Sequence, residues 1–184
     1  IAKKYGVELL VCSSLNRNSG TIVRENTKME KMLISGVAAD KNVAKIRVAG
    51  LGNDPDSTFR LLNLLDKNNL NIDVMIQSLG KDGTKSVSFT VAKPDLLRAL
   101  DLLNDNKDYL GIKKLDSDEK VAKVSVIGAG IRSHSGVAAK MFGALASIGV
   151  NTEMVTTSEI RITVLIDEEY TDLAMRKLHE TFIN

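Results

Sequence analysis

An internal repeat restricts the fold of this chain more than any other feature of its sequence. The segment Val43–Gly52 reads VAKIRVAGLG and returns as Val121–Gly130, which reads VAKVSVIGAG. A unit that recurs along a chain is typical of a duplicated structural module. Because similar patterns follow both copies in the same order, we expect two related units that together fill most of the 184 residues.

Each copy predicts the same succession of strand, helix, strand, strand and helix. The β-branched run that opens a copy is typical of a buried strand, and its Gly-x-Gly end favours a sharp turn. Apolar residues at helical spacing follow, from Phe59 to Leu65 in the first copy and from Val137 to Ile148 in the second. The remaining predicted elements are hairpins at 70–77 with 86–91 and 150–157 with 160–166, and helices at 95–104 and 170–182.

These patterns predict an α+β fold with two ferredoxin-like units of order β-α-β-β-α-β. Residues 112–115 supply the expected fourth strand of the first unit. No strand-like segment follows the last helix of the second unit, so residues 31–38 are its expected substitute. The first unit would then be inserted within the second, and a plain connecting strand at 31–38 is the alternative interpretation.

Composition argues against several classes of function. With 43% hydrophobic residues, the chain can form two small cores, each marginal alone, so we expect units to pair within or between chains. The 25 basic and 23 acidic residues give a net charge of +2, which supplies no field for attracting nucleic acids. The single cysteine, Cys12, allows no internal disulfide or multi-thiolate metal site and favours a reducing, cytoplasmic location. No apolar run reaches membrane-spanning length.

Several long strings carry a resemblance to a known family. The longest are GAGIRSHSGVAAKMF at 128–142 and VTTSEIRI at 155–162. Shorter strings extend it, namely AKKYGV at 2–7, GVAADK at 36–41 and LHETF at 178–182. Together they closely resemble the carboxy-terminal regulatory region of aspartokinase, and the likeness covers essentially the whole chain.

The resemblance implies two ACT domains, which are amino-acid-sensing modules, attached to an enzyme that phosphorylates the side-chain carboxylate of L-aspartate with ATP. It implies bounds of 1–30 for the end of the kinase domain and a linker, 41–118 for the first ACT domain, and 31–40 with 119–184 for the second. The kinase motifs of that family lie upstream of Ile1. This chain is therefore expected to be a piece of a longer protein, inactive alone and without a cofactor, with ATP and Mg only in the missing kinase domain.

The partners that the resemblance implies are of three kinds. The first is L-lysine, L-threonine or both, acting as feedback inhibitors of lysine and threonine biosynthesis. The second is the aspartokinase catalytic domain or subunit, and the third is a second copy, in a homodimer formed through ACT domains. An effector at the seams between units would inhibit by favouring one arrangement of the units over another.

A free amino acid is a zwitterion, and the sequence offers partners for both of its charges. The turns after Gly52 and Gly130 present N–H groups at helix amino ends, which favour a carboxylate. The acidic residues Asp73 and Glu153, each two positions after an asparagine, offer acceptors for the ammonium group. Without the resemblance, both acids are more simply interpreted as exposed charges at a strand edge.

The family's effector contacts, transferred by position, give two pseudo-symmetric sites. The first comprises Asn53, Asp54, Ser57, Thr58, Asp73 and Gln77, with Asn151 and Thr152 from the second unit. The second comprises Ser133, Val137, Ala138, Glu153, Ser158 and Glu159, with Asn71 nearby.

The first loop departs from the family pattern. Lys-Pro-Gly and a small residue are usual there, whereas this chain has Asp54-Pro55-Asp56-Ser57-Thr58. The missing glycine removes backbone freedom and Thr58 adds bulk, so we expect weak binding or an altered preference at this loop. The second loop keeps Gly136 and replaces the usual proline with Ser135, a milder change.

Four other interpretations compete with that of an amino-acid sensor. The two Gly-x-Gly motifs imitate a dinucleotide fingerprint, but the third glycine is absent and the hairpins contradict a parallel sheet. An RNA-binding module would need exposed aromatic residues on its central strands, and segment 86–91 has only Phe89. His134 and His179 lack partners at metal-ligand spacing. A purely structural dimerisation module without bound effector is the main alternative, because ligand-forming and dimer-forming edges coincide in this architecture.

Overall fold

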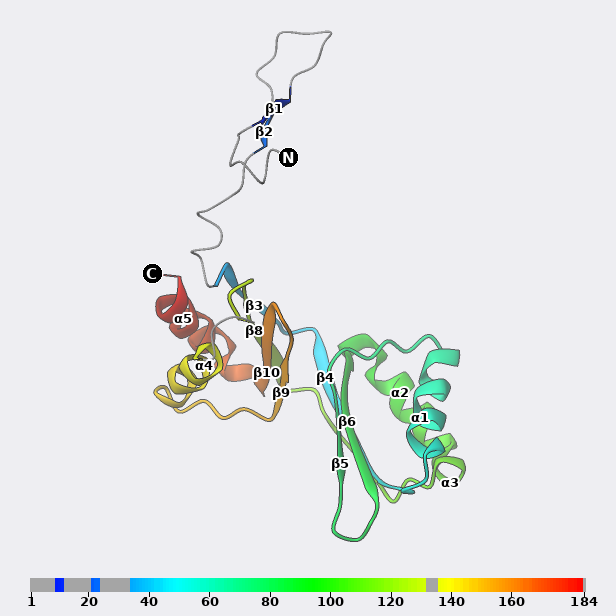
Figure 1. Ribbon diagram of the computed structural model, residues 1–184. Helices are drawn as coiled ribbons and strands as arrows, with labels where there is room; N and C mark the ends of the chain where they lie inside the picture. Colours follow the sequence, from blue (N-terminus) through cyan, green and yellow to red (C-terminus); the bar gives the residue numbers. More distant parts are fainter. Residues whose placement is uncertain (1–8, 12–20, 24–33, 132–135, 184) are drawn as a thin grey trace.

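The computed structural model describes residues 9–11, 21–23, 34–131 and 136–183. Within them, two units lie side by side, each with a four-stranded antiparallel sheet and helices on one face (Figure 1). The predicted α+β class with two ferredoxin-like units is therefore confirmed. Strands β1 (Leu9–Val11) and β2 (Thr21–Val23) pair with each other in a separate two-stranded sheet.

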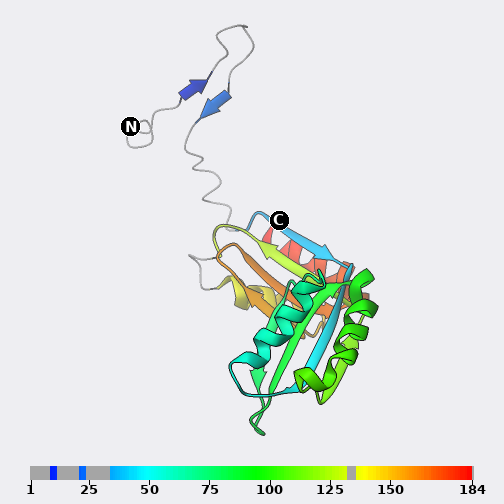
Figure 2. The same cartoon turned by 90° about the vertical axis from the view of Figure 1, so that its right-hand side faces the viewer.

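The first unit places helices α1 and α2 across one face of its sheet (Figure 2). Its elements are β4 (Val43–Leu51), α1 (Asp56–Lys67), β5 (Met75–Leu79), β6 (Lys85–Ala92), the 3-10 turn η2 (Lys93–Asp95), α2 (Leu96–Asp105), α3 (Lys107–Leu110) and β7 (Lys114–Asp118). The strand order is β5-β6-β4-β7. Alternate strand residues such as Ile46, Val48 and Phe89 pack under Leu61 and Leu103 of the helices and are fully buried.

The second unit repeats this plan with the order β3-β8-β10-β9. Its elements are β3 (Gly36–Asp40), β8 (Val121–Ile127), α4 (Val137–Ala146), β9 (Met154–Thr157), β10 (Arg161–Asp167), the 3-10 turn η3 (Glu168–Tyr170) and α5 (Thr171–Phe182). Val124, Val126 and Val164 of the sheet form its core with Met141 of α4 and Leu178 of α5. Helix α4 follows β8 as α1 follows β4, so the corresponding helices of the two units begin after equivalent strands.

Strand β3 occupies the place that β7 holds in the first unit. It pairs antiparallel with β8, from Gly36 opposite Ile127 to Asp40 opposite Lys123. The first unit is thus inserted within the second, as predicted. The strand covers 36–40 rather than 31–38 because β8 ends at Ile127 and offers no partner further on, and residues 31–33 lie outside the described part.

Strands β5 and β9 begin later than the sequence predicts, at Met75 and Met154 instead of residues 70 and 150. Side-chain chemistry explains the first case, because the Thr90 hydroxyl accepts a hydrogen bond from the Val74 N–H at 3.1 Å. Both lead-in segments still bond to the neighbouring strand, because the Asp73 N–H donates to the Thr90 main-chain oxygen at 3.2 Å and the Glu153 N–H donates to that of Leu165 at 2.8 Å. They carry Asp73 and Glu153, each of which contacts a residue of the other unit.

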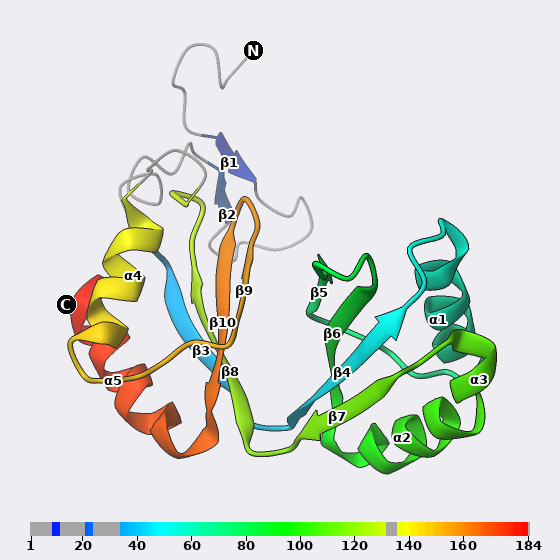
Figure 3. The same ribbon diagram turned by 90° about the horizontal axis from the view of Figure 1, so that it is seen from below.

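The two sheets face each other across an opening, with α1–α3 outside one and α4 and α5 outside the other (Figure 3). Where they converge, five buried residues form a cluster that belongs to both units: Val43, Val74, Val121, Met154 and Leu165. Val43 and Val121 are the first residues of the two repeat copies. The repeat therefore builds the junction from equivalent positions.

No helix in the described residues is long and apolar enough to cross a membrane.

Candidate functional site

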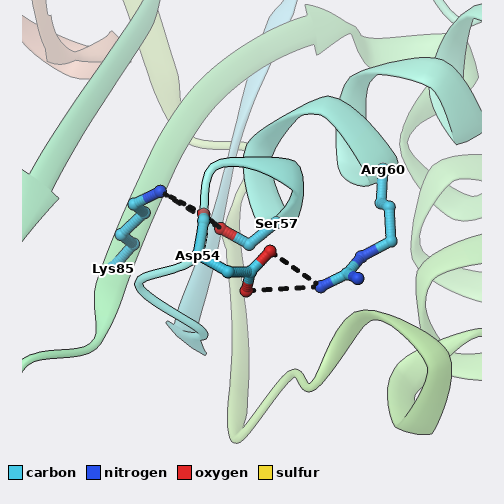
Figure 4. A network of polar contacts seen from close by, with 4 residues as sticks. All are labelled: Asp54, Ser57, Arg60 and Lys85. Atoms are coloured by element: carbon cyan, nitrogen blue, oxygen red, sulfur yellow. Dashed lines mark hydrogen bonds and ion pairs between the residues drawn. The ribbon is translucent and has the colours of Figure 1, made fainter.

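The first loop forms a closed polar network at the amino end of α1 (Figure 4). The Lys85 ammonium donates to the main-chain oxygen of Asp54 at 2.8 Å and lies 3.3 Å from the Ser57 hydroxyl. Arg60 approaches both carboxylate oxygens of Asp54 at 3.4 Å. Gly50 supports the loop with a β-bulge at φ +87°, where an added Cβ would lie 2.4 Å from the Lys113 side chain.

Thr58 and Gln77 meet beside this network. The Thr58 hydroxyl, in the first turn of α1, donates to Gln77 Oε1 of β5 at 2.6 Å. Both residues belong to the first predicted site, so the structure brings Asp54, Ser57, Thr58 and Gln77 together within one unit. Asn53 is exposed in the same loop.

Asp73 turns to the second unit instead. Its carboxylate pairs with the ammonium group of Lys123 on β8, which also pairs with Asp40 at 3.0 Å. The Lys123 side chain is only 15% exposed, whereas that of Asp73 is 63% exposed. The Asp73 carboxylate, which the sequence analysis assigned to the ammonium group of an effector, is thus paired with a lysine of the second unit.

Glu153 makes the equivalent contact in the opposite direction. Its carboxylate pairs with the ammonium group of Lys45 on β4, and Lys45 lies 3.9 Å from Asp118. Lys45 and Lys123 hold the same position in the two repeat copies, as do Asp118 and Asp40 at the ends of the outer strands. A third pair, Lys93 with Glu168 at 2.7 Å, joins the two 3-10 turns. The junction is therefore pseudo-symmetric in its charges as well as in its apolar cluster.

Lys123 holds its proton more firmly than an ordinary lysine. Burial disfavours its charge, but hydrogen bonds and attraction from Asp73 and Asp40 outweigh burial and raise the pKa of Lys123. For Asp40, burial likewise opposes the charge, yet the Lys123 ammonium and the Asn42 N–H together lower its pKa. Both groups are therefore charged at neutral pH, and the pair persists.

A cleft of about 490 Å³ lies on the inner face of the second sheet, next to this junction. Asp40, Asp73, Lys123, Ser125, Ser158 and Arg161 contribute polar groups to its lining. A smaller cleft of about 300 Å³ adjoins it and includes Asn71 and Asp73. These volumes are in the range of small-molecule sites, and the lining offers both charge signs that a zwitterion requires.

The remaining predicted residues are scattered. Val137 is buried in the second core and Ala138 packs against it, so neither side chain presents a polar contact. Asn151 is exposed and Thr152 half-buried ahead of β9, and Glu159 is exposed in the β9–β10 turn. The Ser158 hydroxyl donates to the Arg161 main-chain oxygen at 3.3 Å, and Ser133 lies outside the described residues.

Sequence reasoning missed the cations Lys45, Lys85, Lys123 and Arg161. A signal existed for two of them, Lys45 and Lys123, because each repeat copy places a lysine third in a mostly apolar strand. Such a position marks a side chain on the face away from the helices. No group of three or more histidine, cysteine, aspartate or glutamate residues in the described ranges is arranged to hold a metal ion.

Phe89 bears on the nucleic-acid alternative. It is the only aromatic residue of segment 86–91 and is completely buried in the first core. It therefore offers no stacking surface to a base.

Comparison with known proteins relates this chain to the ACT domain and to aspartokinases. Residues 124–182 match the family model of the ACT domain. The chain is 38% identical over 184 residues to an aspartokinase of Pseudomonas aeruginosa and 37% identical over 188 residues to an aspartokinase of Helicobacter pylori. The matches cover 98% and 99% of this chain, but it spans only 45% and 46% of those proteins.

Solved structures agree with these sequence matches. The alpha and beta subunits of an aspartokinase gave a structure that is 43% identical, with a TM-score of 0.76 over 81% of this chain and 98% of that chain. The ligand-free regulatory subunit of aspartate kinase from Thermus thermophilus is 35% identical, with a TM-score of 0.77 over 82% of this chain and 99% of that chain.

Proposed function

Because the chain belongs to the aspartokinase family, as an ACT-domain regulatory region, we propose that its two units sense a pathway amino acid and control the kinase accordingly. The effector is L-lysine, L-threonine or both. Its binding inhibits the ATP-dependent phosphorylation of L-aspartate by a catalytic domain or subunit outside this chain. The chain itself is inactive, ATP and Mg act only in that catalytic part, and the whole operates in the cytoplasm.

One observation supports this function best. At the junction of the two units, the carboxylates of Asp73 from the first unit and Asp40 from the second line adjoining clefts together with the ammonium group of Lys123. A zwitterion needs an anionic and a cationic partner, and a ligand that contacts both units favours the arrangement in which both can reach it. Sensing and rearrangement are then properties of the same groups.

The difference in binding free energy that the effector must supply follows from the shift between the two states. Moving a two-state equilibrium from almost all active to almost all inactive needs a differential affinity of about 5.5 kcal/mol. A single small ligand seldom supplies this, so we propose that two or more seam sites in a homodimer formed through ACT domains share it.

Isothermal titration calorimetry of the intact chain with L-threonine and with L-lysine tests the proposal, with glycine as the matched control ligand. We expect saturable heat from at least one of the two. Glu153→Gln removes the negative charge while keeping the shape of the side chain, and should weaken binding at the second site about tenfold or more. Asp101→Asn, on the exposed face of α2, should change nothing. Absence of binding by either amino acid would overturn the sensor function.

A structural dimerisation role is the second candidate, and the sheet edges favour it. Strands β5 and β9 end their sheets, and each is paired on one side only within the chain's own sheets. Exposed edges of this kind readily accept a strand from another chain. Sedimentation that shows a stable dimer, combined with no heat from either amino acid, would support this role instead.

A further inference from the structure

The ion pair between Asp73 and Lys123 stands between two clefts. Asp40, Asp73 and Lys123 line both the larger cleft of about 490 Å³ and the smaller cleft of about 300 Å³. The pair therefore forms part of the boundary that the two clefts share, and it is also a contact between the two units. A ligand in either cleft lies next to an anionic and a cationic group.

The two partners of this pair are held differently. The Lys123 side chain is 15% exposed and keeps a second carboxylate, that of Asp40 in its own unit, at 3.0 Å. The Asp73 side chain is 63% exposed, and within the described part of the chain Lys123 is its one ion-pair partner. Asp73 can therefore exchange its partner, while Asp40 keeps Lys123 charged and in place.

We propose that the effector amino acid binds by inserting into this ion pair, with its ammonium group on the Asp73 carboxylate and its carboxylate on the Lys123 ammonium group. Insertion replaces one ion pair by two, so no charge is left without a partner. A lysine ammonium group has three N–H donors, which allows Lys123 to keep Asp40 while it binds the ligand. This inference rests on the proposed sensor function and deepens it, because it names the groups that bind the ligand and places them at the junction instead of at a strand-to-helix loop.

The clefts provide access and space for such a ligand. An ion pair with an exposed partner contributes little to stability, so separating Asp73 from Lys123 costs little before the ligand restores both contacts. The larger cleft has room for the ligand's side chain and includes the hydroxyl-bearing residues Ser125, Thr156 and Thr163 in its lining. Glycine has no side chain to fill it and should bind more weakly than L-threonine or L-lysine.

Insertion links binding to the arrangement of the units. Asp73 belongs to the first unit and Lys123 to the second, so a ligand between their charged groups moves the two residues apart. The ligand then binds a widened junction more tightly than a closed one. The population of chains shifts toward the widened arrangement by that difference in affinity.

The first test is calorimetry of the intact chain with L-threonine and with L-lysine. Asp73→Asn and Lys123→Met each remove one of the two charges, and each should weaken binding at least tenfold. The matched controls Asp66→Asn and Lys120→Met, at exposed positions, should behave as wild type. Asp73→Glu keeps the charge and should retain binding, which separates loss of the charge from a folding defect.

The second test measures the widening. Spin labels at Lys67→Cys in α1 and Glu180→Cys in α5, with Cys12→Ser to remove the native thiol, report the distance between the units by pulsed electron paramagnetic resonance. Labelled chain is diluted with unlabelled chain, so that only distances within one chain are read. We expect the distance to lengthen when L-threonine or L-lysine saturates the otherwise unchanged chain, and to stay constant when Asp73→Asn is added.

The outcomes separate this inference from the sensor function. Weaker binding in both Asp73→Asn and Lys123→Met, together with a longer distance in the ligand-bound chain, supports insertion. Binding by the wild type that either variant leaves unchanged, or an unchanged distance, overturns insertion while the sensor function stands. Absence of binding by the wild type overturns both.

Discussion

At the scale of single residues, polar side chains on the inner sheet faces determine what the junction does. Ser125 and Thr163 are cross-strand partners, each 7% exposed, with their hydroxyl oxygens 2.8 Å apart. Lys123 lies two residues further along β8, on the same face, and contacts Asp40 and Asp73. The sequence indicated the acidic partner of Lys123 but not the lysine itself, because charge on a strand does not reveal which distant residue it will meet.

The Ser125–Thr163 pair gives a first prediction. Thr163→Val leaves the buried Ser125 hydroxyl without its partner and should lower the free energy of unfolding by about 1–3 kcal/mol. Adding Ser125→Ala should recover part of the loss, because no unsatisfied hydroxyl then remains. Urea unfolding of the two single variants and the double variant measures this, and strictly additive losses would contradict it.

Lys123 gives a prediction in pH. Its raised pKa means that its contribution to stability is complete below the ordinary lysine pKa of 10.5 and is lost as the pH rises through the higher folded value. The lowered pKa of Asp40 means that its contribution is present above 3.8 and is lost as the pH falls through the lower folded value. Lys123→Met should therefore be less stable than wild type between these limits, and the two should converge outside them.

Urea midpoints measured across the pH range check this expectation. Lys120→Met, an exposed lysine nearby, is the control and should track the wild type. A gap between wild type and Lys123→Met that is the same at pH 7 and at strongly alkaline pH would contradict the assignment.

At the scale of elements, the local sequence pattern predicted well which helices and strands exist and in what order they follow, but it predicted their boundaries less well. The repeat, the hairpins and the substitution of an early strand for a missing last one are all present. The predicted starts of β5 and β9 were wrong by several residues. At β5 the Thr90 hydroxyl accepts the Val74 N–H, a local contact that no periodicity in the sequence reports. Thr58 and Gln77 contact each other beside the first loop, and their role in a binding site stays a prediction, whereas the partners of Asp73 and Glu153 depend on how the two units dock.

The bulge in β4 gives a prediction at this scale. Gly50→Ala places a Cβ at positive φ and against Lys113, so it should cost about 1–3 kcal/mol of stability and disturb the loop beyond it. Gly36→Ala is the matched control, because a Cβ there meets nothing within 4 Å. Thermal unfolding of both variants measures the difference, and equal melting temperatures would contradict the account.

At the scale of the whole molecule, buried apolar side chains and ion pairs contribute differently to the contact between the two units. Each partly exposed ion pair is worth about 1 kcal/mol or less, whereas a fully buried valine, leucine or methionine contributes about 1.5–3 kcal/mol. The cluster of Val43, Val74, Val121, Met154 and Leu165 therefore holds the units together. The lysine–carboxylate pairs fix the orientation of one unit relative to the other.

Removal of the cross-unit charges should therefore loosen the arrangement without unfolding either unit. In the double variant Lys45→Met and Lys123→Met, we expect a larger radius of gyration by small-angle X-ray scattering and unchanged far-ultraviolet circular dichroism. Lys67→Met with Lys81→Met is the matched control, because both residues are exposed within the first unit. An unchanged radius would mean that the apolar cluster alone fixes the angle.

The insertion of one unit within the other has a mechanical consequence. The chain passes from β3 to β4 between Asp40 and Val43, and returns from β7 to β8 between Asp118 and Val121, and both passages lie at the closed end of the opening (Figure 3). A unit joined through one linker can rotate about several axes, whereas two short linkers side by side restrict it to rotation about one hinge axis. The relative motion of the two units is then described by a single interdomain angle, and a small molecule changes their arrangement by changing that angle.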